Sequence, residues 1–193
     1  DYNENVIQNI TTSNKNQARL VNSYFWEKPS QRTSILMEHE DEEFKQEGII
    51  YDYGEYGIFD PNQQRNRSSK SIAIEHRGSF KSNISFAVST RFDNNSEFKN
   101  GTTSRIEFIY TTPNNHRIRS TYGSAIKNPT FSERFGYYTN FIGNPNLKPE
   151  GSKNFELGFD LDLDSKYLLS GTFFKSKLEN EIDGNAIDPI TLG

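Results

Sequence analysis

The chain has 193 residues, a formal net charge of −4 and a mean hydropathy of −0.84, so we expect no transmembrane helix. It contains no cysteine, which excludes disulfides, thiolate metal sites and a cysteine nucleophile. No basic run supplies the charge that binding to nucleic acid requires, so we expect no nucleic-acid partner. Residues 1–6 lack the basic and apolar stretches of a signal peptide.

Apolar and polar residues alternate with a period of two in most of the chain, and amphipathic helix patterns are nearly absent. This alternation predicts eight strands, at residues 18–28, 31–41, 70–79, 83–93, 102–111, 116–125, 153–164 and 166–178. The Asn-rich opening, residues 3–16, has no such periodicity and is predicted to be a loop.

The predicted connections alternate strictly between short and long. The short ones are residues 29–30, 80–82, 112–115 and 165, and the long ones are 42–69, 94–101 and 126–152. Tight turns at one end and long loops at the other are typical of outer-membrane barrels, whereas Greek-key sandwiches mix loop lengths at both ends. The predicted fold class is therefore all-β, an antiparallel meander of about eight strands forming part of a transmembrane β-barrel.

The same alternation predicts which residues share a face. One face, expected to meet lipid, carries Ile84, Phe86, Val88, Phe92, Ile106, Phe108, Tyr110, Ile118 and Tyr122. The other, expected to line the lumen, carries Glu38, Glu40, Glu75, Arg77, Arg91, Asp93, Arg105, Glu107, Arg117, Arg119, Glu156, Asp160 and Asp162. Alternation alone leaves a solvated sheet face as the alternative, because a soluble sandwich shows the same pattern with the faces exchanged. The strand at 166–178 has apolar residues on both parities, so its faces are not assigned.

The segment from Tyr122 to Phe159, which is predicted to form a strand, a loop and a second strand, resembles a known family. The segments AIKNPTF (125–131), IGNPNLKPE (142–150) and SKNFELG (152–158) closely resemble the barrel of TonB-dependent outer-membrane receptors. Residues 33–44 and 89–98 resemble other strand ends of that barrel, less specifically. The resemblance extends in order over roughly residues 31–182 and is nearest to the vitamin B12 and siderophore receptor branch.

This resemblance implies a plugged barrel of about 22 strands in the outer membrane of a Gram-negative bacterium. It implies a receptor that takes up a scarce nutrient, such as a siderophore–iron complex or a corrinoid, and no enzymatic activity or cofactor. The implied partners are outer-membrane lipid, the nutrient, the receptor's own plug domain and, through that plug, the TonB–ExbB–ExbD energy-coupling complex. No plug or TonB-box segment is recognised, and residues 190–193 lack the aromatic-ended last strand of the family, so residues 1–193 are interpreted as an internal fragment of the barrel domain.

The sequence gives little indication of a catalytic site or a metal site. No Gly-x-Ser-x-Gly elbow accompanies His76 or His116. His39 stands among carboxylates, but on a strand it points away from Glu38 and Glu40, so a metal site is not predicted. The aspartates near Asp160 lack the Gly and Glu of a calcium-binding loop.

Aromatic residues in the first and last long loops are the candidate ligand contacts, because exposed loop aromatics commonly anchor ligands. They are Tyr51, Tyr53, Tyr56, Phe59, Phe135, Tyr137, Tyr138 and Phe141. The alternative is that these rings pack the loops together or lie at the membrane interface.

Two other functions stay open at this level. A small, complete eight-stranded outer-membrane barrel would serve as an adhesin or structural protein, and a soluble β-sandwich would bind carbohydrate or protein partners.

Overall fold

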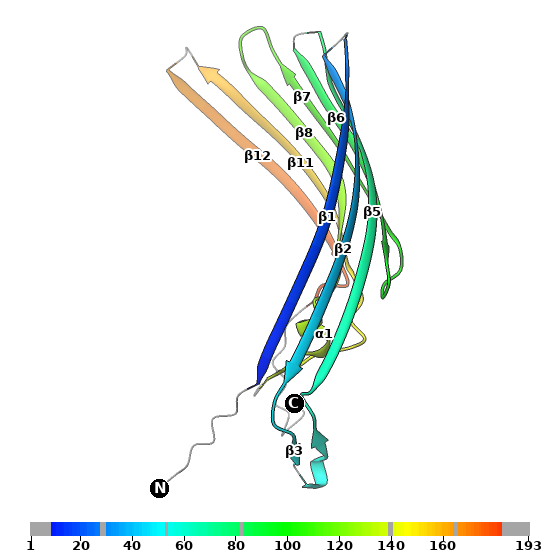
Figure 1. Ribbon diagram of the computed structural model, residues 1–193. Helices are drawn as coiled ribbons and strands as arrows, with labels where there is room; N and C mark the ends of the chain where they lie inside the picture. Colours follow the sequence, from blue (N-terminus) through cyan, green and yellow to red (C-terminus); the bar gives the residue numbers. More distant parts are fainter. Residues whose placement is uncertain are drawn as a thin grey trace.

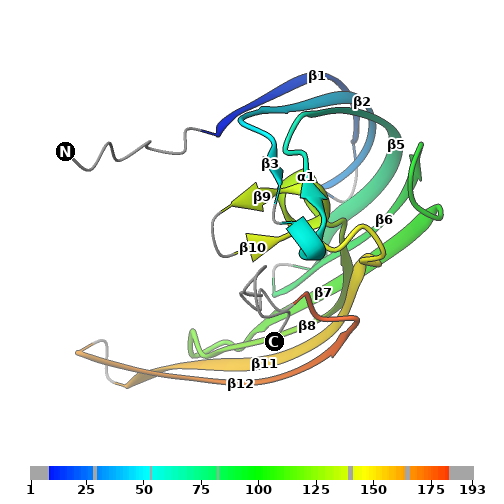
Figure 2. The ribbon, with the colours of Figure 1, turned by 90° about the horizontal axis from the view of Figure 1, so that it is seen from below.

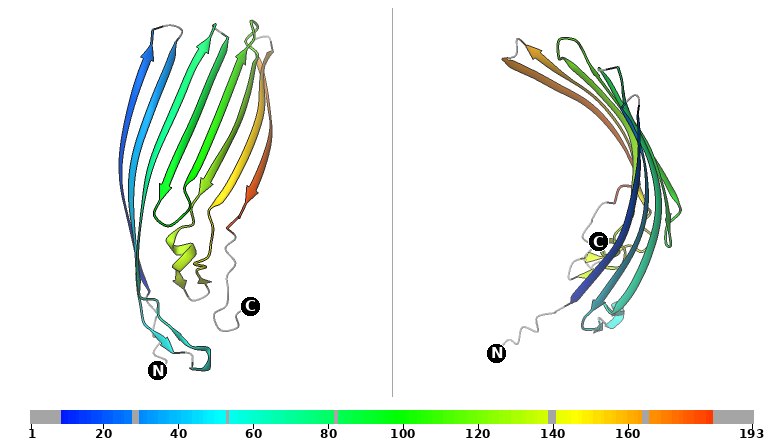
Figure 3. Two further views of the ribbon diagram at one scale, coloured as in Figure 1. Left: turned by 90° about the vertical axis from the view of Figure 1, so that its right-hand side faces the viewer. Right: turned by 45° about the horizontal axis from the view of Figure 1, so that its top comes forward.

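A computed structural model describes residues 9–27, 30–52, 54–81, 83–138, 141–163 and 166–182. These residues form one curved, antiparallel sheet of eight strands that follow one another in chain order (Figures 1 and 3). The strands are β1 (Ile10–Trp26), β2 (Gln31–Glu47), β5 (Gln63–Phe80), β6 (Ile84–Asn95), β7 (Gly101–Thr111), β8 (Arg117–Lys127), β11 (Glu150–Leu163) and β12 (Tyr167–Glu179). The predicted all-β meander of eight strands is confirmed.

Short elements lie in the long connections. They are β3 (Tyr51–Asp52), the 3-10 helix η1 (Gly54–Tyr56), β4 (Ile58–Phe59), α1 (Phe131–Phe135), β9 (Tyr137–Tyr138) and β10 (Phe141–Ile142). No helix within the described ranges is long and apolar enough to cross a membrane.

Several predicted strand ends are wrong, and the largest errors lie at the long-loop end. β1 begins at Ile10, so half of the expected loop at 3–16 is strand; β2 continues to Glu47, and β5 begins at Gln63. The long connections therefore shrink to residues 48–62, 96–100 and 128–149. The cause is a continuous backbone ladder: residues 42–46 of β2 pair with residues 63–67 of β5 although every side chain in these two runs except Phe44 is polar.

The cross-strand register confirms the predicted faces. Val88 pairs with Ile106, Ile106 with Tyr122, and Tyr122 with Phe155, so one apolar row runs across four strands. Directly opposed residues in a ladder share a face. The neighbouring row, with the other parity, is polar and joins Arg77, Ala87, Glu107, Thr121 and Glu156.

The polar face is the concave one. Figure 2 shows α1, β9 and β10 inside the curve of the sheet. Phe44 of β2 stacks on Phe131 of α1, with ring centroids 5.7 Å apart, so the side of β2 that carries Phe44 is concave. Glu38 and Glu40 share its parity, whereas Ile35 and Met37 lie on the convex side and are 40% and 53% exposed.

The register also assigns the faces of β12. Leu169 pairs with Leu161 and lies on the convex face. Phe174 pairs with Glu156 and lies on the concave face. The apolar residues on both parities of β12 therefore divide between the two sides of the sheet.

The sheet is open, because β1 and β12 are its outer strands and do not pair with each other. A complete eight-stranded barrel requires that pairing, since closure alone removes the sheet edges. The described strands therefore do not form the small closed barrel that the sequence left open as an alternative.

Because side chains alternate between the two faces, adjacent positions of β11 should differ in how well they tolerate a charged residue. Leu157→Arg, on the convex face, should destabilise the full-length protein in lipid vesicles by about 2–4 kcal/mol, because it places a cation against hydrocarbon. Glu156→Arg, one residue away on the concave face, should cost less than about 1 kcal/mol. Denaturant titration of the vesicle-embedded protein measures both, and equal costs would contradict the facing.

Candidate functional site

The candidate site lies on the concave face at the long-loop end, where the connection 128–149 folds back over the sheet (Figure 2). We call this region the mouth. α1 begins there in a capping box: the Thr130 hydroxyl oxygen accepts from the backbone N–H of Glu133 (3.1 Å), and the Glu133 carboxylate accepts from the N–H of Thr130 (2.7 Å). Such a box satisfies two otherwise free N–H groups and fixes where the helix starts.

The connection closes on itself through Gly143. Its N–H donates to the carbonyl of Gly136 (2.8 Å), and the N–H of Asn144 donates to the carbonyl of Glu133 (2.9 Å). A Cβ at Gly143 would lie 2.5 Å from backbone atoms of Arg134 and Phe135, closer than atoms can approach without movement of the chain. Glycine at this position therefore allows the segment after β10 to pack against α1.

Arg67 of β5 anchors the connection to the sheet. The residue is 8% exposed, and its Nη1 donates to the carbonyl of Pro129 (2.8 Å) while Nη2 forms an ion pair with Glu42 of β2. The guanidinium lies over the Phe131 ring, 4.8 Å from its centroid. A buried cation is stabilised only when it is paired and hydrogen-bonded, and here both conditions hold.

Arg134 makes a second anchor, to the connection between β6 and β7. It forms an ion pair with Glu97 (2.6 Å) and donates to the carbonyl of Pro145 (3.1 Å). Its guanidinium lies over the rings of Phe98 and Phe135, at 5.0 and 4.6 Å. The two arginines therefore fasten three separate segments together around aromatic rings.

A polar cavity of about 410 Å³ lies on the concave wall beside the base of the connection. Lys15, Glu40 and Glu42 line it together with Asn128 and Thr130 of the connection. Lys15 and Glu40 form an ion pair at 2.8 Å. The cavity offers charged groups of both signs and amide and hydroxyl groups, which suits a polar ligand rather than an apolar one.

Further along the concave wall, a network centred on Glu38 joins four strands. The Glu38 carboxylate, whose side chain is 6% exposed, accepts from Arg19 and Arg91, both at 2.7 Å. Arg91 also donates to Asp93 (2.8 Å) and to the hydroxyl oxygen of Ser71 (2.8 Å). The network therefore holds the nearly buried Glu38 carboxylate in charge-assisted hydrogen bonds to two guanidiniums.

A second network joins the last three strands. Arg119 of β8 donates to the Asp160 carboxylate (3.0 Å) and to the Thr172 hydroxyl oxygen of β12 (3.1 Å). To reach β12 it crosses β11 at Gly158, where a Cβ would lie 2.5 Å from its Nε. Glycine in this strand therefore makes room for the arginine.

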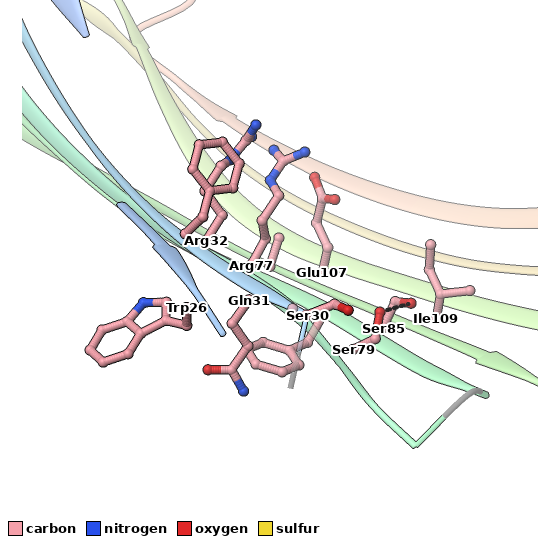
Figure 4. A pocket seen from close by; sticks show the side chains of 13 residues that line it. Trp26, Ser30, Gln31, Arg32, Arg77, Ser79, Ser85, Glu107 and Ile109 are labelled. Atoms are coloured by element: carbon pink, nitrogen blue, oxygen red, sulfur yellow. Dashed lines mark hydrogen bonds between the residues drawn. The ribbon is translucent and has the colours of Figure 1, made fainter. Parts of the chain in front are cut away.

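The short-turn end carries a different pocket, of about 610 Å³. In Figure 4, Arg32, Arg77 and Glu107 point to one side of the sheet, while Trp26 and Gln31 point to the other. The register places the first three on the concave face and the last two on the convex face. Because its lining residues lie on opposite faces of the sheet, this pocket is not a single binding site.

The predicted ligand contacts are only partly described. Phe135 lies in the mouth between two guanidiniums, those of Arg65 (4.8 Å) and Arg134 (4.6 Å). The remaining predictions lie outside the described side chains: Tyr51, Tyr53, Tyr56, Phe59, Tyr137, Tyr138 and Phe141.

The residues near His39 do not converge. His39 contacts Asp41 on its own strand, 3.0 Å away, on the face opposite Glu38 and Glu40. In the part of the chain that the structure describes, no group of three or more histidine, aspartate or glutamate side chains is arranged to hold a metal ion.

The sequence did not predict the anchors of the mouth. Phe44 and Arg67 were assigned to a loop, although Phe44 continues the parity of Glu38 and Glu40, and Arg67 that of Ser71. This continued alternation was the available signal, but the polar residues between them obscured it.

The comparisons with known proteins agree with this architecture. A protein-family model described as TonB dependent receptor-like, beta-barrel, matches residues 2–193. The vitamin B12 transporter BtuB of Vibrio cholerae serotype O1 is 36% identical over 99 residues, which are 51% of this chain and 16% of that transporter.

Solved structures show the same fold. The siderophore receptor PirA from Acinetobacter baumannii superposes with a TM-score of 0.70 at 17% identity, over 96% of this chain and 31% of the receptor. A mutant of the ferric enterobactin receptor PfeA from Pseudomonas aeruginosa, in complex with enterobactin, gives 0.71 at 14% identity, over 88% and 27%.

The fold and the family match define part of a strand-built outer-membrane barrel. The chain belongs to the TonB-dependent receptor β-barrel family. Family barrels lie in the outer membrane of Gram-negative bacteria, where short turns face the periplasm and long loops face outward, so the mouth lies at the extracellular end. The chain spans 16% of the length of the curated transporter and 31% of the siderophore receptor.

Gly143 provides a test of how the connection is closed. Gly143→Ala should weaken the packing of residues 131–147 by about 1–3 kcal/mol, because the new methyl group overlaps backbone of α1. Hydrogen exchange of the amides in this segment of the full-length receptor measures the loss. Gly151→Ala is the control, since a Cβ there meets nothing within 4 Å; equal protection in the two variants would refute the closure.

Arg67 tests the anchor to the sheet. Arg67→Lys keeps the charge but cannot hold Pro129 and Glu42 while stacking on Phe131, so the connection should lose about 2–4 kcal/mol of local stability. Arg65→Lys, on the same face of β5 but exposed, should cost less than about 1 kcal/mol. The rate of proteolysis of the connection in the folded receptor reports both losses of stability. An Arg67→Lys variant that is cleaved no faster than the Arg65→Lys variant would contradict the anchoring role of Arg67.

Proposed function

We propose that the chain is part of the barrel of a TonB-dependent transporter that captures a scarce metal chelate, such as a ferric siderophore or a corrinoid, at its mouth. In this proposal the plug domain and the remaining strands belong to other parts of the full-length receptor. The observation that carries it is the connection 128–149, which is fastened over the concave wall beside a polar cavity of about 410 Å³.

The position of the connection supports capture. An extracellular loop that folds into the lumen narrows the opening and brings its side chains to the path that any solute must follow. Arg67 and Arg134 hold the base of this loop to three segments, so its ligand-facing residues are pre-positioned. Pre-positioning lowers the entropy that binding must otherwise offset.

The chemistry of the mouth suits a chelate with aromatic or anionic groups. Phe135 offers a ring between two guanidiniums, and Arg65, exposed on β5, forms no ion pair with a carboxylate among the described residues. Catecholate and phosphate-bearing ligands carry the complementary negative charge. We propose Tyr51, Tyr53, Tyr56, Phe59, Phe135, Tyr137, Tyr138 and Phe141 as the aromatic contacts.

The similar proteins support the class of cargo. Their names include a vitamin B12 transporter, siderophore receptors, a receptor in complex with enterobactin, and the copper transporter OprC. All four descriptions concern metals or metal chelates. The shared fold with different cargoes indicates that the loops, rather than the strands, select the ligand.

The proposed partners follow from the family. The charged concave wall, including the network around Glu38, would face the plug domain, and the plug would connect the receptor to the TonB–ExbB–ExbD complex. Uptake would then require the inner-membrane energy source, while binding at the mouth would not.

A binding and uptake experiment tests the proposal. The full-length receptor is produced in a strain that lacks its own vitamin B12 and siderophore receptors, and labelled cyanocobalamin and ferric enterobactin are supplied. We expect one of the two to bind, and its uptake, but not its binding, to be lost when TonB is deleted. Failure of both chelates to bind, or uptake that persists without TonB, would contradict the proposal.

The aromatic contact has its own test. Phe135→Leu keeps an apolar side chain but removes the ring between Arg65 and Arg134, so affinity for the chelate that binds should fall about 5- to 10-fold, which corresponds to about 1–1.5 kcal/mol. Phe98→Leu, which alters an anchor ring on the other side of Arg134, serves as the matched control. Equal losses of affinity in the two variants would indicate that the substitutions loosen the mouth and do not remove a ligand contact.

A further inference from the structure

Two carboxyl groups lie side by side in the polar cavity of the mouth. Glu40 and Glu42 are two residues apart on β2, so both point to the concave face, and their side chains are 15% and 22% exposed. On the opposite face of β2, His39 and Asp41 follow Met37, which is the last apolar residue of that face. The two glutamates therefore lie beyond the lipid-facing part of β2, where protons reach them from the external medium.

Each of these carboxyl groups has one cationic partner. Lys15 of β1 lies 2.8 Å from Glu40, and Arg67 of β5 forms an ion pair with Glu42. The other groups that line the cavity are neutral: Ser13, Ser69, Asn95, Asn128 and Thr130. The charged side chains of α1 pair with groups outside this cavity. Among the described lining residues, only the two glutamates can change their charge in mildly acidic water.

The two carboxyl groups also contact each other. Glu40 and Glu42 are hydrogen-bonding partners, and a hydrogen bond between two carboxyl groups requires a proton on one of them. Burial and this hydrogen bond raise the pKa of Glu42, and Arg67 opposes them only in part. Burial acts in the same direction on Glu40, but the hydrogen bond from Glu42 and the Lys15 ammonium outweigh it and lower the pKa of Glu40. The pair therefore holds one proton in a pH range in which two separate glutamates would have lost it.

The retained proton is coupled to the packing of the connection 128–149. Arg67 binds Glu42 and the carbonyl of Pro129 (2.8 Å) at the same time, and Asn128 and Thr130 line the cavity beside them. If the connection lifts from the wall, Glu42 returns to water and the cause of its proton retention is weakened. A group that binds a proton more tightly in the packed state stabilises that state as the pH falls.

We propose that Glu40 and Glu42 share one proton while the connection 128–149 is packed on the wall, so that mildly acidic water tightens the mouth and neutral water loosens it. This direction is opposite to that of an ordinary arginine–carboxylate anchor, which weakens when its carboxylate is protonated. The device does not depend on the identity of the cargo.

The sign follows from the two shifts. The stabilisation by Glu42 is fully present below the pKa of a glutamate in water and is lost as the pH rises through the raised pKa of Glu42. In stronger acid the trend reverses, because the pKa of Glu40 is lowered and its protonation removes the charge that Lys15 pairs with. The connection should therefore be held most tightly in mildly acidic water.

Hydrogen exchange of the full-length receptor, without any chelate, tests this proton coupling. Exchange is followed from about pH 4.5 to about pH 7.5, and each amide rate is divided by its intrinsic chemical rate at that pH. The amides of Arg134 and Gly136, which bond within α1, report the opening constant of the connection. This constant should rise with pH by up to about tenfold per pH unit, the slope for one proton, and level off once the pair has lost that proton.

Two substitutions keep the protonated arrangement at every pH. Glu42→Gln places an amide that donates to Glu40 while its oxygen accepts from Arg67, so the opening constant should no longer depend on pH in this range. Glu40→Gln supplies the donor from the other side of the pair and should have the same effect. Glu43→Gln, at the next position of β2 on the opposite face, is the matched control and should keep the full pH response.

The pH trend of the unmodified receptor decides the proposal even if a variant fails to fold. An opening constant that stays level or falls as the pH rises would identify an ordinary ion-pair anchor and overturn the shared proton. A folded Glu42→Gln variant that keeps the pH response, or a Glu43→Gln variant that loses it, would also overturn it. Because no chelate is added, these outcomes are distinct from those of the binding and uptake experiment.

Discussion

Within a bilayer, each strand must find its backbone hydrogen-bond partners on its neighbours, because hydrocarbon offers none. The eight-stranded ladder meets this requirement for its inner strands, and in doing so it fixes the facing of every side chain. A slip of one residue between β8 and β11 would turn either Arg119 or Asp160 toward lipid, separating an ion pair of 3.0 Å. Register, rather than any single contact, is therefore the feature on which the lumen, the lipid face and the mouth all depend.

Most of the membrane-spanning strands could be predicted from sequence, since alternation is regular where one face must be apolar; β12, with apolar residues on both parities, is the exception. Ile84, Phe86 and Val88 of β6 gave the faces correctly because each stands between small or polar neighbours. The strand ends could not be predicted in this way. Beyond Asp41 both parities carry acidic residues, Glu42 and Glu43, so the alternation is obscured although the backbone ladder continues to Glu47. Backbone hydrogen bonding does not itself require alternating side chains, so only the parity of Phe44 and Arg67 indicated that these strands continue.

The anchors of the mouth escaped prediction for a related reason. Arg67 is stabilised by Glu42 and by the carbonyl of Pro129, which are 25 and 62 residues away in sequence, and no local pattern connects such positions. The sequence did show a distinctive motif at residues 142–150. The structure gives a physical reason for its glycine: Gly143 passes so close to the backbone of α1 that no side chain fits.

The mouth and the convex, lipid-facing side of the sheet are subject to different constraints, although the same strand ladder forms both. Across the membrane, alternation leaves few choices on the convex face, because its residues must suit hydrocarbon, whereas the concave face is mostly polar and also carries Phe174. At the extracellular end, this constraint ends while β2 and β5 still supply a rigid wall for attachment. Arg67 and Phe44 use that wall to hold the base of the connection, so its remaining residues can vary without disturbing the strands. Under the proposed function, this division would let one barrel fold serve chelates as different as a corrinoid and a siderophore, because the ligand contacts would lie at positions that the ladder does not constrain.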